Sequence, residues 1–276
     1  MMRRSKSGLH FLLFWLWALQ AAAAEGTTLR LGSVAQDAPI VMQQRLLPLT
    51  SYLSKALGRP VVLKLSTDMP DAINALVSND VDLTYLTPVA YVSAHDRARI
   101  QLVAKVVNER QPNFKLMIIV RENSTIRKVE DLAGKRFAFG DPAALLQRAV
   151  VVGAGMPLNR LGEYSFVDHY DNVVRGVMVG DFDAGIVIDT TAARWQGRGI
   201  RVLHASNNLP PYNISASAEL DHATVARLRE ALLRLDPANP AHKSVISALE
   251  PTYTGFTAAT DADYDVIRKL IAPFKK

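Results

Sequence analysis

The chain has 276 residues, of which 49% are hydrophobic and 21% are charged, and its formal net charge is +6. This length can bury one large core or two smaller lobes, and the composition is that of an ordinary globular protein. The absence of cysteine excludes disulfides, thiolate nucleophiles, cysteine-based metal sites and a lipid-modified cysteine. No basic stripe with interleaved aromatic residues occurs, so nucleic acid is not an expected partner.

The first residues predict export. Arg3, Arg4 and Lys6 precede a short apolar run over residues 9–19, and four alanines end at Ala24. This pattern is typical of a secretory signal peptide over residues 1–24, cleaved after Ala24. An uncleaved anchor is the alternative, although the run is short for a membrane span. Cleavage removes three basic residues and no acidic one, which lowers the formal charge from +6 to +3. An exported binding protein without a lipid anchor needs a second membrane to retain it, so we expect a periplasmic protein.

Strands and helices alternate along the first part of the mature chain. A strand over residues 29–34 leads to a helix that begins at Pro39 and carries Leu46, Leu49 and Leu53 on one face. Gly58 ends this helix. The following elements are a strand over 61–65, a helix from about 70, a strand ending at 86, a short helix from 88 and a strand over 102–107.

Two segments 101 residues apart repeat one pattern. Residues 69–86 and 170–187 each read as a helix capped by Asp or Asn, a polar turn, an Asp-apolar-Asp step and an apolar strand. Such a unit is half of a βαβ motif, so its recurrence predicts two similar α/β lobes in one chain. Chance recurrence of a common α/β pattern is the alternative. Small ligands bind in the cleft between two such lobes.

Two polar crossings divide the rest of the chain. The first lies at residues 108–113 and the second at 207–211, with a strand-and-helix lobe between them. We therefore expect a signal peptide (1–24), a first lobe (25–110 and 208–276, the latter with C-terminal helices) and a second lobe (111–207). The predicted fold is α/β, with two lobes that are each a mainly parallel sheet flanked by helices. Two crossings form a hinge that allows closure.

Candidate ligand-binding residues follow from the corners between strands and helices, where helix N-termini point backbone donors beyond the strand ends. These candidates are Thr67, Met69, Thr87, Asp141, Ala144, Leu145, Tyr170 and Asp189, and the family resemblance described below adds Leu86. Asp141 is expected to cap a helix that has Pro142 at its first position. No histidine pair has metal-binding spacing, and no nucleophile motif occurs, so we expect no metal, no cofactor and no catalysis.

Several motifs resemble one family. These are Leu31-Gly32-Ser33, Asp80-Val81-Asp82-Leu83, Phe137-Ala138-Phe139-Gly140-Asp141-Pro142 and the run from Thr260 to Asp265. Together they are similar to the periplasmic phosphate/phosphite/phosphonate-binding proteins of ABC importers, over roughly residues 29–274. The resemblance implies the type II fold of two-lobe periplasmic binding proteins, which transferrin lobes share. It also implies a binding protein for a small molecule that works with a membrane permease. A ligand-sensing partner of a membrane histidine kinase is the alternative, and an enzyme is the least expected reading.

The resemblance also implies where an oxyanion would be held. The family usually carries a Ser-Thr-Ser run after Gly-Asp-Pro, where this chain has Ala144-Leu145-Leu146, and it often has a histidine at the position of Tyr170. The acidic residue of the family is retained as Asp189. We therefore expect weak binding of phosphate and simple phosphonates, and a less charged ligand with an apolar part that Tyr170 and Asp189 contact. If Leu145 and Leu146 instead point into the second lobe, backbone amides alone would bind phosphate.

Overall fold

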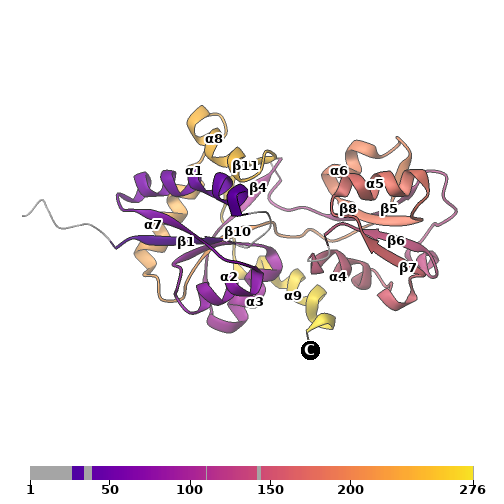
Figure 1. The fold of residues 1–276 in the computed structure, drawn as a ribbon, viewed down its shortest axis with the longest axis horizontal. Helices are drawn as coiled ribbons and strands as arrows, with labels where there is room; N and C mark the ends of the chain where they lie inside the picture. Colours follow the sequence, from indigo (N-terminus) through magenta and orange to yellow (C-terminus); the bar gives the residue numbers. More distant parts are fainter. Residues whose placement is uncertain (1–26, 34–38, 110, 142–143, 276) are drawn as a thin grey trace, which may run out of the picture.

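The computed structural model describes residues 27–33, 39–109, 111–141 and 144–275. Figure 1 shows two α/β lobes side by side, with extended segments running between them and the C-terminal helix below. The predicted signal peptide lies outside the described residues. A search of those residues finds no helix with the length and apolar character needed to cross a membrane.

The first lobe is built on a six-stranded sheet with the order β11-β4-β10-β3-β1-β2. Its strands are β1 (Leu29–Ser33), β2 (Val61–Leu65), β3 (Leu83–Leu86), β4 (Gln101–Asn108), β10 (Asn213–Ala216) and β11 (Tyr253–Thr257). Its helices are α1 (Pro39–Leu57), α2 (Met69–Val77), α3 (Pro88–Ala98), α7 (His222–Leu233) and α8 (Pro240–Leu249). The predicted stripe of Leu46, Leu49 and Leu53 on α1 is completely buried, and it shares a core with α7 and α8 on one face of this sheet.

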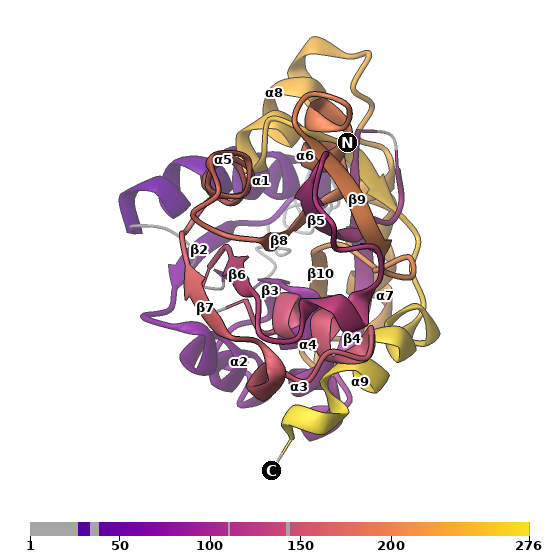
Figure 2. The ribbon, with the colours of Figure 1, turned by 90° about the vertical axis from the view of Figure 1, so that its right-hand side faces the viewer.

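The second lobe is built on a five-stranded sheet with the order β7-β6-β8-β5-β9. Its strands are β5 (Leu116–Arg121), β6 (Arg136–Phe139), β7 (Glu163–Phe166), β8 (Ala184–Ile188) and β9 (Ile200–Ala205). Its helices are α4 (Leu145–Gly153), α5 (Tyr170–Val179) and α6 (Asp189–Trp195). Short 3-10 turns lie at Val129–Leu132, Leu158–Arg160, Asp261–Tyr264 and Ala272–Phe274. Figure 2, a view along the long axis, shows this lobe in front of the first.

The α/β two-lobe prediction is confirmed, but both sheets are mixed rather than mainly parallel. In the first sheet β1 pairs in parallel with β2 and β3, whereas β10 lies antiparallel between β3 and β4. In the second sheet β5 runs antiparallel to both of its neighbours. The crossings explain the difference, because each crossing feeds a strand into its sheet in the direction opposite to that of the βαβ strands beside it.

The internal repeat extends to individual hydrogen bonds. The last aspartate of each Asp-apolar-Asp step accepts hydrogen bonds from an arginine near the start of a neighbouring strand. The arginine donates from both its backbone nitrogen and its guanidinium group. Asp82 accepts bonds from the Arg30 backbone nitrogen (2.7 Å) and Nε (3.1 Å), and Asp183 accepts the same two bonds from Arg136 (2.9 and 3.3 Å). The guanidinium of each arginine also donates to a backbone carbonyl in the turn that comes just before the aspartate in the sequence. The two lobes therefore use one local design twice.

The two crossings, which in the structure are the segments between β4 and β5 and between β9 and β10, contact each other. Phe114 and Leu209 exchange a pair of backbone hydrogen bonds, N–H to O, at 3.0 and 2.8 Å. Beside them the buried ammonium of Lys105, in the middle of β4, bonds Asn113 on the first crossing (3.2 Å) and Asp263 (3.3 Å). The connection between the lobes is therefore a short hydrogen-bonded ribbon with an ion pair at one end.

The last helix touches both lobes. Helix α9 (Asp265–Ile271) packs against α3 of the first lobe and α4 of the second, as Figure 1 shows. Its buried Ile267 and Ile271 belong to one apolar cluster that includes Tyr91 from α3 and Ala149 from α4. The C-terminal segment, predicted to belong to the first lobe, thus ends in a helix shared by both.

Candidate functional site

A cavity of about 470 Å³ lies between the two lobes. Both lobes and both crossings contribute to its walls, and this volume is within the range of small-molecule sites. The lining residues are Met69, Thr87, Pro88, Val89, Phe114, Leu116, Asp141, Ala144, Leu145, Leu146, Gln147, Tyr170 and Tyr212. The cavity is therefore the place where a ligand can contact both lobes at once.

The first-lobe wall is the corner between β3 and α3. The hydroxyl of Thr87 accepts a hydrogen bond from the Ala90 backbone nitrogen (3.0 Å), and Pro88 occupies the first turn. Both features favour a helix start at this point. They place Thr87 at the cavity edge, while Leu86 before it is fully buried in the core beneath α3. Met69, at the start of α2, completes this wall.

The second-lobe wall is the segment between β6 and α4. Helix α4 begins at Leu145 with Ala144 as its N-cap, so the prediction that Asp141 caps this helix is wrong. The carbonyl of Asp141 accepts a hydrogen bond from the Ala144 backbone nitrogen (3.0 Å), so Asp141 lies ahead of the helix. Pro142, predicted as the first helical residue, lies outside the described residues. Ala144 and Leu145 consequently face the cavity from the first turn of α4.

Gln147 joins three parts of the second-lobe wall. Its side-chain oxygen accepts the backbone N–H of Gly140 (2.8 Å), and its amide hydrogen-bonds the hydroxyl of Tyr170 at the start of α5. Burial raises the pKa of Tyr170 to about 12, the bond from Gln147 opposes this, and the negative charges of Asp141 and Asp189 add to it. The Tyr170 hydroxyl is therefore protonated at neutral pH and fixed in position.

Six of the nine predicted residues line the cavity: Met69, Thr87, Asp141, Ala144, Leu145 and Tyr170. The other three lie elsewhere. Leu86 is buried because all four residues of the short strand β3 are enclosed by the sheet and helices. Thr67 is exposed and bonds Asp71 through its backbone nitrogen and hydroxyl. Asp189 lies near Tyr170, but its carboxylate accepts the backbone N–H groups of Lys115 and Thr190.

The sequence reasoning missed Phe114, Leu116, Gln147 and Tyr212 among others. Phe114 and Tyr212 could be predicted from the crossings, because a chain segment that runs between two lobes borders the cleft between them. Gln147 gave no comparable signal, since its importance depends on the contacts with Gly140 and Tyr170.

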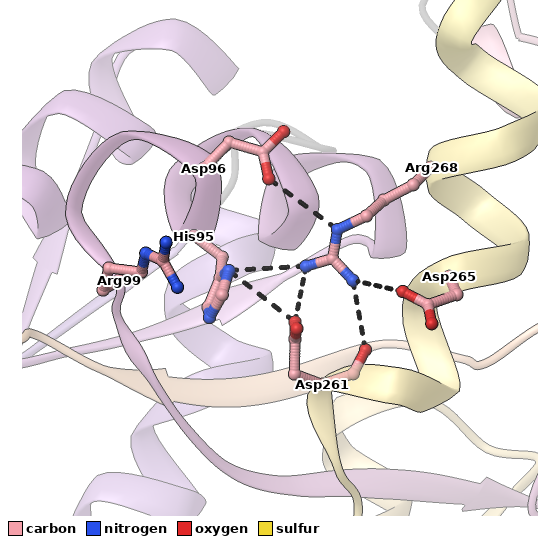
Figure 3. A pocket seen from close by; sticks show the side chains of 6 residues that line it. All are labelled: His95, Asp96, Arg99, Asp261, Asp265 and Arg268. Carbon is pink, nitrogen blue, oxygen red and sulfur yellow. Dashed lines mark hydrogen bonds and ion pairs between the residues drawn. The ribbon is translucent and has the colours of Figure 1, made fainter.

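A second pocket, of about 340 Å³, lies on the surface between α3 and α9 (Figure 3). Arg268 at its centre bonds the carboxylates of Asp261 (2.5 Å) and Asp265 (2.9 Å) and lies 3.7 Å from Asp96. Asp261 also accepts the hydroxyl proton of the Tyr91 side chain at 2.9 Å. Because the contacts of Arg268 with Asp96 and of Tyr91 with Asp261 join α9 and the turn before it to α3, we assign this cluster to fastening α9 onto the first lobe. Within the described ranges no group of three potential metal ligands occurs.

Comparisons with known proteins agree with this geometry. A sequence model of the family described as "ABC transporter, phosphonate, periplasmic substrate-binding protein" matches residues 31–264. The phosphate-import protein PhnD of Mycolicibacterium smegmatis is 25% identical over 188 residues, which span 62% of this chain and 59% of that relative. The match thus covers less than two thirds of the curated relative.

Two solved structures share the fold. PhnD1 from Prochlorococcus marinus, in complex with methylphosphonate, has a TM-score of 0.69 at 18% identity, covering 90% of this chain and 98% of its own. XAC2383 from Xanthomonas citri, bound to a chloride ion, has a TM-score of 0.72 at 19% identity, covering 89% and 96%. Since the family match spans most of the sequence, this chain belongs to the periplasmic substrate-binding proteins of phosphonate ABC transporters.

Proposed function

We propose that this protein captures a small solute between its lobes and delivers it to the membrane permease of an ABC importer. The observation that carries the proposal is the cavity lined from both lobes. Family membership supports a transporter binding protein rather than an enzyme, and gives no support to a histidine kinase as the partner. The family is periplasmic, and we propose that this chain reaches the periplasm by cleavage after Ala24. N-terminal sequencing of the periplasmic protein tests the cleavage, and an intact Met1 on membrane-bound protein would contradict it.

The residues that we propose for contact with the solute are the six predicted ones on the cavity wall. Thr87 and Met69 present one side, and Asp141, Ala144, Leu145 and Tyr170 present the other. Each set is attached to its own sheet, so the two sets approach one another only when the lobes rotate. A solute that contacts both sets stabilises the closed state, because a ligand shifts an equilibrium by its difference in affinity for the two states.

The hinge of this motion is the hydrogen-bonded ribbon at Phe114 and Leu209. Few residues need to change their backbone angles there, as in other hinge closures. The contact between α9 and α4 is the second connection between the lobes. Because its apolar side chains belong to two different helices, closure proceeds there as a small sliding movement between packed helices.

Closure can be measured directly because the chain has no cysteine of its own. Ile40 on α1 and Val179 on α5 are 60% and 66% exposed and lie on different lobes. We expect that dyes on Ile40→Cys and Val179→Cys move together when the small-molecule fraction of the host periplasm is added, as read by energy transfer. A control pair, Ile40→Cys and Leu233→Cys, lies within the first lobe and should not change. An unchanged distance across the lobes, for a fraction shown by mass spectrometry to bind, would contradict the proposal.

A further inference from the structure

We infer that Lys105 is a positioning residue for closure of the lobes, because its buried ammonium holds the first crossing at Asn113 and confines bending of that crossing to Phe114. The inference rests on the proposed function, since it concerns the hinge about which the lobes rotate. Three observations carry it: where each crossing is bonded to each lobe, how Lys105 is buried, and what Phe114 contacts.

The first part of the first crossing belongs to the first lobe. Asn108, the last residue of β4, exchanges two backbone hydrogen bonds with Gln111 at 3.0 and 2.7 Å, so the chain turns back on itself here. Asn113 then lies beside the middle of β4, where its side-chain oxygen accepts a bond from the Lys105 ammonium at 3.2 Å. The crossing therefore stays on the first lobe as far as Asn113.

The second lobe holds the same crossing directly afterwards. The backbone nitrogen of Lys115 donates to the carboxylate of Asp189 on α6 at 2.8 Å, and β5 begins at the next residue. Phe114 is left between Asn113 and Lys115, and a single residue has only two soft backbone angles. Rotation of the lobes about this crossing is thus concentrated at Phe114.

The second crossing is bonded to the two lobes in a matching way. At one end the backbone nitrogen of Ser206 donates to β5 at 2.9 Å, and at the other end the carbonyl of Tyr212 accepts an N–H from β4 at 2.9 Å. Between these ends, Leu209 exchanges its two hydrogen bonds with Phe114. The bending parts of the two crossings therefore lie side by side.

Lys105 places a charge where stability alone does not require one. It is 6% exposed, and its ammonium also bonds Asp263 (3.3 Å) in the turn before α9. An apolar side chain of similar size often replaces a buried ion pair without loss of stability. Such a side chain offers no directed bond to Asn113, however. The same ammonium joins the crossing to the turn that leads into α9, which is the other connection between the lobes.

Phe114 connects the hinge to the cavity. It lines the inter-lobe cavity, so bending at this residue moves a wall that a solute contacts. A crossing released from Lys105 would bend over several residues instead of one. The lobes would then sample a wider range of positions before a solute binds. Capture would weaken, because apparent affinity falls with the fraction of protein in the competent state.

Pulsed electron–electron double resonance on the solute-free protein tests the inference, with spin labels at Ile40→Cys and Val179→Cys on the two lobes. Asn113→Ala removes the bond to the crossing and keeps the ion pair of Lys105, and it should broaden the distribution of distances between the labels. Lys105→Met keeps an apolar stem and should broaden the distribution at least as much. Labels at Ile40→Cys and Leu233→Cys, both on the first lobe, should report no change in either variant.

Hydrogen exchange followed by mass spectrometry measures the size of the effect. Losing a hydrogen bond to a charged group shifts a local equilibrium by about 10- to 100-fold, so Asn113→Ala should speed exchange of the Phe114 N–H by such a factor. Asp263→Asn is the matched control, because it removes the anion and keeps the bond from Lys105 to Asn113. It should lower stability without broadening the distance distribution.

Two results would overturn the inference. One is an unchanged distance distribution in folded Asn113→Ala protein, and this variant decides alone if Lys105→Met does not fold. The other is equal broadening by Asp263→Asn, which would assign the effect to lost stability rather than to the crossing. Failure of the proposed function gives a different result, because the wild-type label pair would then not approach on adding the small-molecule fraction of the host periplasm.

Discussion

Replacing Ile267 by alanine should destabilise the whole protein, because this side chain joins the two lobes. Ile267 lies in the middle of α9, is completely buried, and belongs to the apolar cluster shared by α3 and α4. The substitution removes three carbon groups. At about 0.8 kcal/mol for each buried group the lost transfer free energy is about 2.4 kcal/mol. The cavity that remains adds to this cost, so we expect a loss of about 3–4 kcal/mol.

Differential scanning calorimetry measures this effect. For a chain of this size each kcal/mol lowers Tm by about 2–4 °C, so Ile267→Ala should lower it by about 10 °C. Weakening the shared cluster should also separate the unfolding of the two lobes, which would appear as a second transition or a broader one. Val179→Ala, at a position that is 66% exposed, is the matched control and should change stability by no more than about 0.5 kcal/mol. A shift below about 2 °C for Ile267→Ala, with a single sharp transition, would refute the role given to α9.

Three further predictions concern charges and the cavity. Burial alone would raise the pKa of Asp183, but hydrogen bonds from Arg136 outweigh it and hold the pKa below its usual range. The stability that this bond provides is therefore complete above about pH 4 and is lost as the pH falls through the lowered pKa. In the Asp183→Asn variant, the free energy of unfolding should depend less on pH in that window. Asp263→Asn leaves the buried ammonium of Lys105 without its anionic partner and should lower the free energy of unfolding in urea by about 1–3 kcal/mol. A change below about 0.5 kcal/mol would show that water replaces the lost carboxylate. Leu145→Ser adds a hydroxyl at the first turn of α4 and should improve methylphosphonate binding about tenfold by calorimetry; no gain would place this residue outside the ligand contact.

The features that the sequence predicts well are local ones. The buried stripe on α1 follows from leucine spacing, and the repeated Asp-apolar-Asp step marks two equivalent positions on two sheets. The bonds of Asp82 to Arg30 and of Asp183 to Arg136 show why the step recurs, because each aspartate ties its strand to the first residues of a neighbour. These patterns depend on residues close in sequence or on a period that the chain itself displays.

The features that the sequence predicts poorly depend on long-range geometry. The position of β10 between β3 and β4 is fixed by where the second crossing returns to the first lobe, which no local pattern records. Leu86 and Thr87 are neighbours, yet one is buried and the other lines the cavity, because the strand ends between them. The sequence predicts the start of α4 too early because Gly-Asp-Pro is a common helix start, whereas the helix begins at Leu145 with Ala144 as its N-cap.

The most direct test is a crystal structure of the protein purified from its own periplasm with its solute bound. The account predicts density in the inter-lobe cavity from a solute that contacts Thr87 on the first lobe and Tyr170 on the second. The lobes should be rotated toward one another about the ribbon at Phe114. A solute bound outside this cavity, or bound in it with the lobes unmoved, would contradict it.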